Sequence, residues 1–405
     1  MGDERSLDGV KVVDLQWVMA GPAASRILAD HGATVVRVES QRRVDTARTM
    51  APFYGGLPGA ENSAFFQNLN ASKLGLTLNL TTEGGRAVVL DLARWADVVL
   101  ESYSPGVMRG WGLDYESLRQ EKPGLIMVST CLMGQTGPLA NFAGFGSLAA
   151  AVCGFYEVTG WPDRPPAGPF GAYTDTMAPR FLAVAVLAAL DHRRRTGQGQ
   201  YIDQSQAESA LHFLAAALLD YGVNGRAQGR AGNRDARMAP HGVYPAAGDD
   251  RWVAIAVAND DQWRALCDVI ERPELASDER FATAQARLAR EDELDEIVSA
   301  WTREREPLEI EAALQARGVP ASLVQEGRDL CEDPQLAHRG HLVEVPHPEH
   351  GTVTVEGPRF RLSRTPARVE RAAPTFGQDN QQVLETLLGY SPERIAELAA
   401  EGALE

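Results

Sequence analysis

The sequence predicts an α/β protein with a Rossmann-like large domain, built on a parallel sheet, and a smaller α/β domain. Apolar runs of strand length alternate with helical patterns through the first half of the chain, which is typical of parallel strands joined by helices. A segment rich in glycine and arginine, residues 223–242, then interrupts the pattern, and further strand and helix signals follow it. These two observations predict two domains.

Four apolar runs are predicted to be strands of the parallel sheet: KVVDL at 11–15, TVVRVE at 34–39, DVVLE at 97–101 and LIMVST at 125–130. Between the first two, AGPAASRILADHG supplies a turn and a helix, which completes a strand-helix-strand unit about 30 residues long. The turn after the first strand reads QWVMAGP and lacks the G-x-G-x-x-G pattern. A dinucleotide cofactor is therefore not supported.

The later segments predict how the domains divide. We assign 1–222 to the large domain, 223–242 to a linker, 243–330 to the small α/β domain and 331–405 to a return segment that completes the large domain. In the return segment, HLVEVPHPEHGTVTVEGPRFRL alternates like strands, and QQVLETLLGYSPERIAELAAEG is predicted to form two capped helices. Glycine-rich basic segments can cradle phosphates, but 223–242 has no helix directly after it, so a linker is favoured.

Composition excludes several classes of protein. The 405 residues include 39 basic and 55 acidic side chains, which argues against sequence-independent binding to nucleic acid or to anionic membranes. The four cysteines are scattered without C-x-x-C spacing, so we expect them to be reduced packing residues. The first residues lack the pattern of a secretion signal, and no run of eighteen apolar residues occurs, so we expect a cytoplasmic protein.

One carboxylate, Asp175, precedes a long apolar helix. The run FLAVAVLAAL at 181–190 has no polar side chain, so we expect this helix to be buried on nearly every face. The helix dipole stabilises an anion at this end by roughly 0.3–1 kcal/mol, which would keep Asp175 charged and nucleophilic. Helix capping explains the position equally simply, since Asp175 lies four residues before Pro179. Asp175 is thus a candidate nucleophile or a helix cap.

Several segments, taken in order, resemble the family III CoA-transferases. They are LDGVKVVDL, AGPAASRILADHGATVVRVES, NLNASKLGLTLNL, ADVVLESYSPGVMRGWGLDYESL, MGQTGP, the helix of Asp175 followed by R-x-x-T-G-x-G-Q, GRAGNRDARMAP and DPQLAHRGHLVEV. The resemblance covers almost the whole chain, and its specificity comes from the set. The family includes formyl-CoA and carnitine CoA-transferases and 2-methylacyl-CoA racemases.

The resemblance implies a reaction and an assembly. The acyl group would be carried by Asp175, the substrates would be an acyl-CoA and a small carboxylic acid, and no cofactor would be permanently bound. Two chains would interlock as rings in a homodimer. Some family enzymes pair two related chains of which one carries the aspartate, so a heteromer with this chain as the active subunit is an alternative.

The resemblance also implies CoA contacts. Val18, Met19 and Ala20 would meet CoA through their backbone, and Ser40 and Arg42 would lie near its adenine and ribose phosphate. Leu78 would pack on the adenine, although a core strand position explains it equally well. Some relatives have glutamine at Met19, so the oxyanion donor here must be a backbone group or another residue.

Two departures from the family follow further along. The E-N-F-x-P-G pattern of relatives is ESYSPG here, so Ser102 replaces an amide while Tyr103 keeps an aromatic face. Relatives place an arginine one residue after Arg109, where this chain has Gly110. A phosphate or pantetheine contact by Arg109 and simple surface solvation therefore both remain open.

The residue at position 145 distinguishes the two chemistries of the family. Racemases pair the aspartate with a histidine that aligns with Phe145, and no histidine lies between His31 and His192. Phe145 would instead line the substrate pocket. We therefore predict a CoA-transferase, and keep a racemase, an acyl-CoA hydrolase and a CoA-binding protein without chemistry as alternatives.

No metal site is predicted. His338, His341, His347 and His350 lie close together, but PHPEHG has the composition of a turn, and its prolines exclude a helix that would align ligands. The sequence also lacks H-E-x-x-H, P-loop and G-x-S-x-G motifs.

Overall fold

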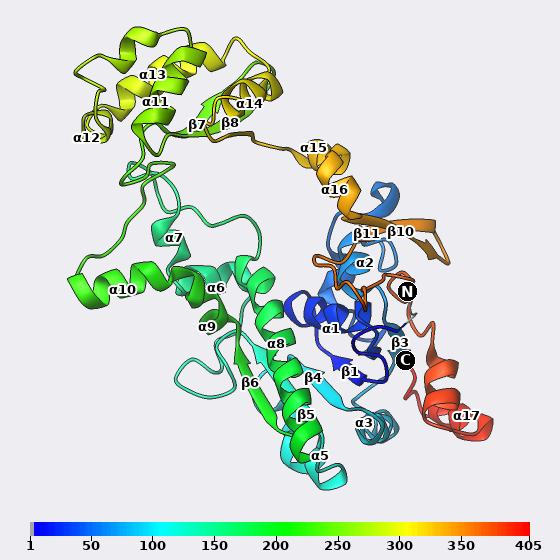
Figure 1. Ribbon diagram of the computed structural model, residues 1–405. Coiled ribbons are helices and arrows are strands. Elements are labelled where there is room, and N and C mark those ends of the chain that lie inside the picture. The colour runs from blue at the N-terminus through cyan, green and yellow to red at the C-terminus, as the bar shows by residue number, and fades with distance from the viewer. Residues whose placement is uncertain (1–3) are drawn as a thin grey trace. The chain divides into compact units, whose positions relative to one another are not determined.

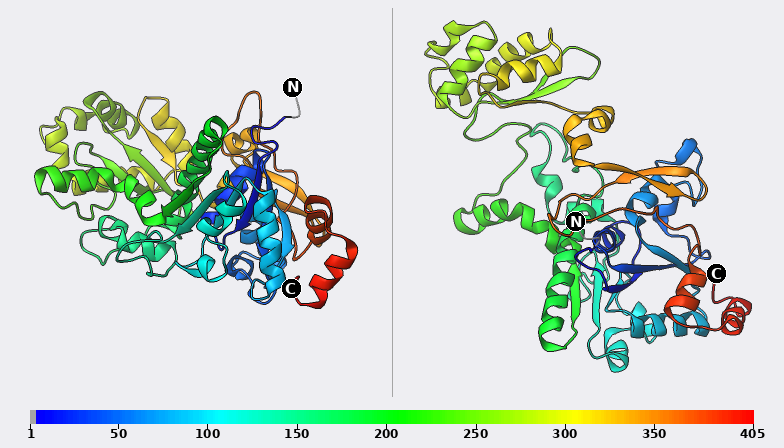
Figure 2. Two further views of the ribbon diagram at one scale, coloured as in Figure 1. Left: turned by 90° about the horizontal axis from the view of Figure 1, so that it is seen from below. Right: turned by 45° about the vertical axis from the view of Figure 1, so that its right-hand side comes forward.

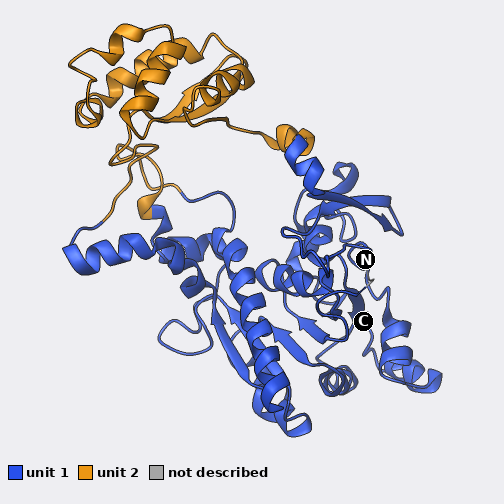
Figure 3. Cartoon of the chain, in the orientation of Figure 1, with its two compact units in different colours: residues 1–156, 168–227, 334–405 blue, residues 157–167, 228–333 orange. Residues whose placement is uncertain are grey.

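The computed structural model describes residues 4–405, which divide into two compact units (Figure 3). The first unit contains the chain up to residue 156, residues 168–227 and residues 334–405. The second unit contains residues 157–167 and 228–333. The segment 157–167 was predicted as part of the large domain, whereas it lies in the second unit.

The first unit is built on six parallel strands in the order β3-β2-β1-β4-β5-β6 (Figure 1). The four predicted strands are confirmed as β1 (Lys11–Leu15), β2 (Thr34–Glu39), β4 (Val98–Glu101) and β5 (Ile126–Cys131). The edges are β3 (Leu74–Thr77) and β6 (Tyr201–Ser205). From β1 the connections run toward one edge of the sheet, and from β4 they run toward the other edge. Doubly wound sheets bind ligands at such a switch point, which here lies between β1 and β4.

Helices cover both faces of this sheet because its strands are apolar on both sides (Figure 2). On one face, Val13 and its neighbours pack against α3 (Glu83–Trp95), α5 (Tyr115–Glu121) and α17 (Pro392–Ala400). On the other face, Val12 and its neighbours pack against α1 (Ala20–Asp30) and α8 (Tyr173–Thr196). The predicted strand-helix-strand unit is therefore confirmed.

Helix α8 is buried along one side only, so the expectation that nearly every face is buried was wrong. Leu182 and Val186 pack onto the sheet, whereas Val184 and Leu187 on the opposite side are 65% and 44% exposed. The helix belongs to one of the two helix layers that cover the sheet, and the side that carries Val184 and Leu187 faces solvent. Gly197 ends the helix in the left-handed conformation, with φ of 76°.

Shorter helices complete the site and the rest of the first unit. They are α2 (Ala64–Asn70), α4 (Val107–Gly110), α6 (Gly146–Val152), α7 (Phe155–Val158, which crosses into the second unit), α9 (Gln206–Leu211), α10 (Ala215–Asn224) and α16 (Pro334–Arg339). The next element after β2 is a 3₁₀ turn, η1 (Thr46–Thr49).

The second unit packs three antiparallel strands against helices around a core of its own. The strands are β7 (His241–Pro245), β8 (Trp252–Ala256) and β9 (Ala321–Leu323), and the helices are α11 (Asp260–Val269), α12 (Ala284–Leu288), α13 (Glu291–Thr302) and α14 (Pro307–Gln315). The short helix α15 (Gly327–Glu332) also belongs to this unit. Between Asn224 and His241 the described chain forms no helix or strand.

Residues 334–405 of the return segment lie in the first unit. Its alternating stretch forms the antiparallel hairpin of β10 (Leu342–His347) and β11 (Gly351–Glu356). Ser391 caps α17, but residues 382–387 form a short π-helical stretch without a side-chain cap, so the expectation of two capped helices holds for the second alone. Among residues 4–405, no helix is long and apolar enough to span a bilayer.

Candidate active site

Most sequence-predicted site residues gather at the carboxyl ends of the parallel strands. The loops after β1, β4, β5 and β6 enclose a cavity of about 180 Å³, which we call the Asp175 pocket. It lies at the switch point between β1 and β4, where the connections that follow these two strands run to opposite sides and leave a crevice. Of the predicted residues, it is lined by Val18, Met19, Ala20, Ser102, Tyr103, Phe145 and Asp175.

The carboxylate of Asp175 faces this pocket and does not cap its helix. Helix α8 begins at Tyr173, and Ala172 is its N-cap residue, so the capping interpretation was wrong. The Oδ2 atom of Asp175 accepts a hydrogen bond of 3.2 Å from the N–H of Gly146, the first residue of α6. Thr174 Oγ1 donates to the carbonyl of Gly146 at 3.1 Å, which ties the two helix starts together.

Gly146 permits this approach because it has no side chain. A Cβ atom at this position would lie 2.6 Å from Cγ of Asp175 and 2.7 Å from Oδ2. Any other residue at 146 would therefore displace the carboxylate. Phe145, directly before it, is 58% exposed and forms part of the pocket wall.

Burial decides the charge state of Asp175. The side chain is 6% exposed, and this desolvation raises the pKa of Asp175 to about 6, against a smaller lowering by the Gly146 N–H. Desolvation outweighs the single hydrogen bond that Asp175 accepts, so its pKa lies above that of a free aspartate. Asp175 is nevertheless mainly ionised at neutral pH.

The other titratable groups of the pocket stay protonated. Burial raises the pKa of Cys131 to about 11 and that of Tyr103 to about 12. A protonated thiol or phenol is a poor nucleophile. None of the residues that line the pocket, all within the described chain, is a histidine. The arrangement therefore offers one weakly solvated carboxylate for attack on an electrophilic carbon.

The turn after β1 is held by hydrogen bonds from neighbouring loops. Ser102 Oγ accepts from the backbone N–H of Trp17 at 2.9 Å, and the Tyr103 hydroxyl accepts from the indole N–H of Trp17 at 3.3 Å. Val18 has a positive φ of 63°, and its N–H donates to Asp45 at 3.1 Å. Ser102 and Tyr103 thus fix the turn that carries Val18.

A second cavity of about 150 Å³ adjoins the first and shares Trp17 and Tyr103 with it. We call it the Arg43 pocket. It brings together Ser40, Arg42 and Leu78, as the resemblance implies, and adds Arg43, whose guanidinium lies 4.9 Å from the ring centroid of Trp17. Arg42 is exposed and its Nε donates to Glu405 at 2.7 Å.

Arg109 lies apart from these two cavities. It is exposed and lines a third cavity of about 560 Å³ with Tyr115, Gln135 and Tyr201. This cavity meets the Asp175 pocket at Ser104 and Pro105. The structure therefore does not bring Arg109 together with the other predicted residues.

Sequence reasoning assigned no role to four residues that shape the site: Trp17, Arg43, Asp45 and Gly146. Trp17 and Arg43 were adjacent to predicted positions, so the strand-end rule could have found them. Asp45 and Gly146 meet the site only through contacts that the fold creates.

Of the four histidines of the return segment, His347 and His350 lie in the hairpin of β10 and β11, whereas His338 lies in α16. The rings of His347 and His350 stack at 4.7 Å, and His350 Nε2 lies 3.2 Å from the carbonyl oxygen of Glu61. Within residues 4–405, no three side chains of the metal-binding types gather at one point.

Known proteins and a family model resemble this chain. The model described as CoA-transferase family III matches residues 7–380. The chain is 35% identical to the succinyl-CoA–D-citramalate CoA-transferase of Chloroflexus aurantiacus, over 98% of this chain and 97% of that protein. It is 36% identical to the succinate–glutarate CoA-transferase of Agrobacterium fabrum, over 94% and 95%. The crystal structure of a CaiB/BaiF family protein from Brucella suis matches with a TM-score of 0.88 at 32% identity, over 95% and 100%.

Proposed function

The chain belongs to CoA-transferase family III, and we propose that Asp175 carries the acyl group in its reaction. The enzyme moves CoA from an acyl-CoA donor to a carboxylic acid acceptor. The observation that carries our proposal is the ionised, nearly buried carboxylate of Asp175 in the cavity at the switch between β1 and β4.

The proposed reaction begins when an Asp175 oxygen attacks the thioester carbonyl of the donor. The carbon–sulfur bond breaks, which leaves an aspartyl-acyl anhydride and CoA thiolate. The thiolate then attacks the Asp175 carbonyl, so the donor acid departs and an aspartyl-CoA thioester forms. The acceptor carboxylate attacks this thioester to give a second anhydride, and the returning thiolate attacks its acceptor carbonyl. Acceptor-CoA leaves and the Asp175 carboxylate is regenerated.

Exclusion of water is as important as the nucleophile, because water would hydrolyse either anhydride. Asp175 is 6% exposed, which supports such protection. The oxyanion formed at each step needs a donor. Met19 has no polar side chain, so we assign this role to the backbone N–H groups of Met19 and Ala20 at the start of α1, where first-turn N–H groups lack intrahelical partners.

The CoA nucleotide would occupy the Arg43 pocket, with its thioester end in the Asp175 pocket. Leu78 supplies an apolar wall, Ser40 a hydroxyl, and Arg42 and Arg43 supply positive charge for phosphates in an otherwise acidic protein. The shared residues Trp17 and Tyr103 would flank the pantetheine between them. A contact between Arg109 and CoA has less support, because Arg109 lines neither cavity.

The named relatives suggest the first substrates to examine. One acts with succinyl-CoA on D-citramalate, and the other connects succinate with glutarate. We therefore propose succinyl-CoA as the donor and a small dicarboxylic acid as the acceptor. A racemase is disfavoured because Phe145 can neither give nor take a proton.

We also propose that the active form is an interlocked homodimer, in a protein of the cytoplasm without a permanently bound cofactor. Apolar side chains are exposed on α8 and α10, including Val184, Leu219 and Val223 at 65% or more, and such surfaces mark interfaces. Light scattering of the purified chain tests this assembly. A monomer alone would favour a heteromer with a related chain, in which this chain carries the active aspartate.

The experiment that tests the nucleophile is borohydride reduction after incubation with succinyl-CoA, followed by mass mapping of the peptide that contains Asp175. Borohydride converts an aspartyl-CoA thioester to an alcohol, so the mass of residue 175 should fall by the difference between a carboxyl and a hydroxymethyl group. Asp175→Asn should give no such product and no transfer. An unreduced Asp175 in protein that transfers CoA would refute the covalent mechanism.

A further inference from the structure

The turn that enters the Asp175 pocket contains a strained residue. Val18 has φ of 63°, in the left-handed region where a β-branched side chain is disfavoured. Val18 lines the pocket, and Met19 and Ala20 follow it. Strain of this kind persists only where surrounding contacts hold the backbone in place.

One buried side chain holds this strained backbone. Both carboxylate oxygens of Asp45 lie within hydrogen-bond distance of the N–H of Val18, at 3.1 and 3.3 Å. The same carboxylate accepts from the N–H of Ala47 at 2.9 Å, where it caps η1. Asp45 is 1% exposed, so water does not compete for these bonds.

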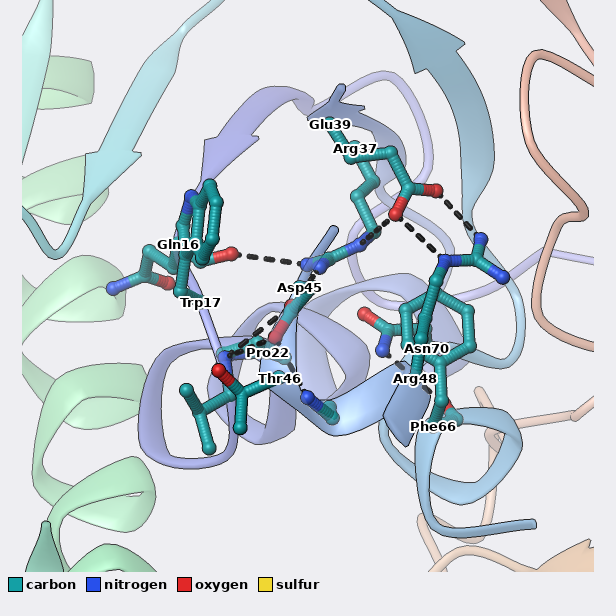
Figure 4. A network of polar contacts seen from close by, with 12 residues as sticks. Gln16, Trp17, Pro22, Arg37, Glu39, Asp45, Thr46, Arg48, Phe66 and Asn70 are labelled. Atoms are coloured by element: carbon teal, nitrogen blue, oxygen red, sulfur yellow. Dashed lines mark hydrogen bonds and ion pairs between the residues drawn. The ribbon is translucent and has the colours of Figure 1, made fainter. Parts of the chain in front are cut away.

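Arg37 in turn fixes Asp45. Its guanidinium forms a hydrogen-bonded ion pair with Asp45, and its Nη1 donates to the carbonyl of Gln16 at 3.0 Å (Figure 4). Arg37 therefore holds the turn on both sides of Trp17, at the Gln16 carbonyl directly and at Val18 through Asp45. Arg37 also forms ion pairs with Asp14 at 3.9 Å and Glu39 at 4.0 Å.

We propose that Asp45, oriented by Arg37, is a positioning residue for CoA transfer that keeps Val18 left-handed and thereby aims the Met19 and Ala20 N–H groups at the thioester carbonyl. This inference rests on the proposed function, in which that carbonyl sits beside Asp175. Without Asp45, Val18 relaxes toward negative φ, and the peptide plane between Val18 and Met19 rotates. The donors then miss the position of the oxyanion.

The test combines removal of Asp45 with removal of the strain. Asp45→Ala is expected to lower kcat by about ten- to a hundredfold while KM for succinyl-CoA changes much less. Val18→Gly alone supplies the reference kcat for the double variant, because glycine adopts the left-handed conformation without a clash. In the double variant, Val18→Gly should recover a large part of the lost kcat, because the penalty that drives the relaxation is gone.

A matched control separates this role from general support of the fold. Asp30 is also a buried carboxylate in an ion pair, with Arg26 at 3.3 Å, but it lines neither cavity. Asp30→Ala should lower the unfolding temperature, and Val18→Gly should not restore anything that Asp30→Ala loses. If Val18→Gly also fails to restore kcat to Asp45→Ala, the inference is wrong, and Asp45 merely stabilises the fold.

Asp45→Asn keeps the question answerable if Asp45→Ala does not fold. Its side-chain carbonyl can still accept from Val18, so kcat should stay within about threefold of wild type while the unfolding temperature falls. A large loss of kcat in folded Asp45→Asn that Val18→Gly does not restore would overturn the inference. Borohydride trapping on the wild type distinguishes the two proposals. If Val18→Gly rescues kcat but no Asp175 adduct is trapped, only the proposal that Asp175 is the nucleophile fails. If the adduct is trapped but Val18→Gly does not rescue kcat, only the proposed role of Asp45 fails.

Discussion

The close approach of Gly146 to Asp175 allows a quantitative prediction for Gly146→Ala. The added Cβ would lie 2.6 Å from Cγ of Asp175, whereas ordinary contacts begin at 3.4 Å, so the carboxylate must move by about 0.8 Å. Effective attack needs reacting atoms in near-attack geometry, and a displacement of about 1 Å costs about a hundredfold in rate. We therefore expect kcat to fall by about a hundredfold.

Stability should change little, because the group that must move is the end of a side chain and position 146 has no positive φ. Alanine in the first turn of α6 should alter the free energy of unfolding by less than about 1 kcal/mol. The assays are steady-state transfer from succinyl-CoA and thermal unfolding. Gly222→Ala is the matched control, since a Cβ at Gly222 in α10 meets no atom within 4 Å.

The result that would refute this reasoning is normal kcat in folded Gly146→Ala. It would mean that the position of the Asp175 carboxylate does not limit transfer, and that another group reacts. If Gly146→Ala loses kcat because it unfolds, the loss says nothing about the Asp175 carboxylate. Gly146→Ser has a slightly larger side chain and would not avoid this outcome. In that case the yield of the borohydride-trapped Asp175 product in the folded fraction decides the point.

Three further predictions follow from burial and charge. The pKa of Asp175 is raised to about 6, so ionisation of Asp175 lowers the free energy of unfolding fully above pH 6 and not at all below pH 3.8. Asp175→Asn should therefore abolish transfer yet raise the free energy of unfolding at pH 7 by on the order of 1–3 kcal/mol. Chemical denaturation that shows a destabilised variant would contradict this prediction. The same pKa predicts that kcat/KM of the wild type is constant above pH 7 and falls tenfold per pH unit well below pH 6. A kcat/KM that stays constant down to pH 4.5 would mean that the reaction does not require the ionised form of Asp175. Arg43→Ala should raise KM for succinyl-CoA by about three- to tenfold and weaken the salt dependence of KM, with kcat nearly unchanged. The control is Arg119→Ala, because Arg119 is an exposed arginine on α5 that lines none of the three cavities. Equal KM shifts in both variants would remove Arg43 from the CoA site.

Local pattern was sufficient for the elements with a clear period. The runs that became β1, β2, β4 and β5 are apolar on both faces, and such runs are stable only between two layers of helices. The edge strand β3 was not among the predicted strands, because LGLT is short and contains a glycine. The exposed side of α8 could not be predicted either, because an apolar sequence indicates which side chains favour burial but not whether another element lies there to cover them.

The sequence by itself determined the parallel sheet, the order of its helices and, through the family resemblance, the candidate residues at the strand ends. Only the tertiary structure decided which candidates meet: it joined Asp175 with the turn of Val18, and it left Arg109 in another cavity. It also decided the raised pKa of Asp175 and the contact of Asp45 with Val18. Desolvation and hydrogen bonds between distant segments depend on how the layers pack, and no local period in a sequence encodes that packing.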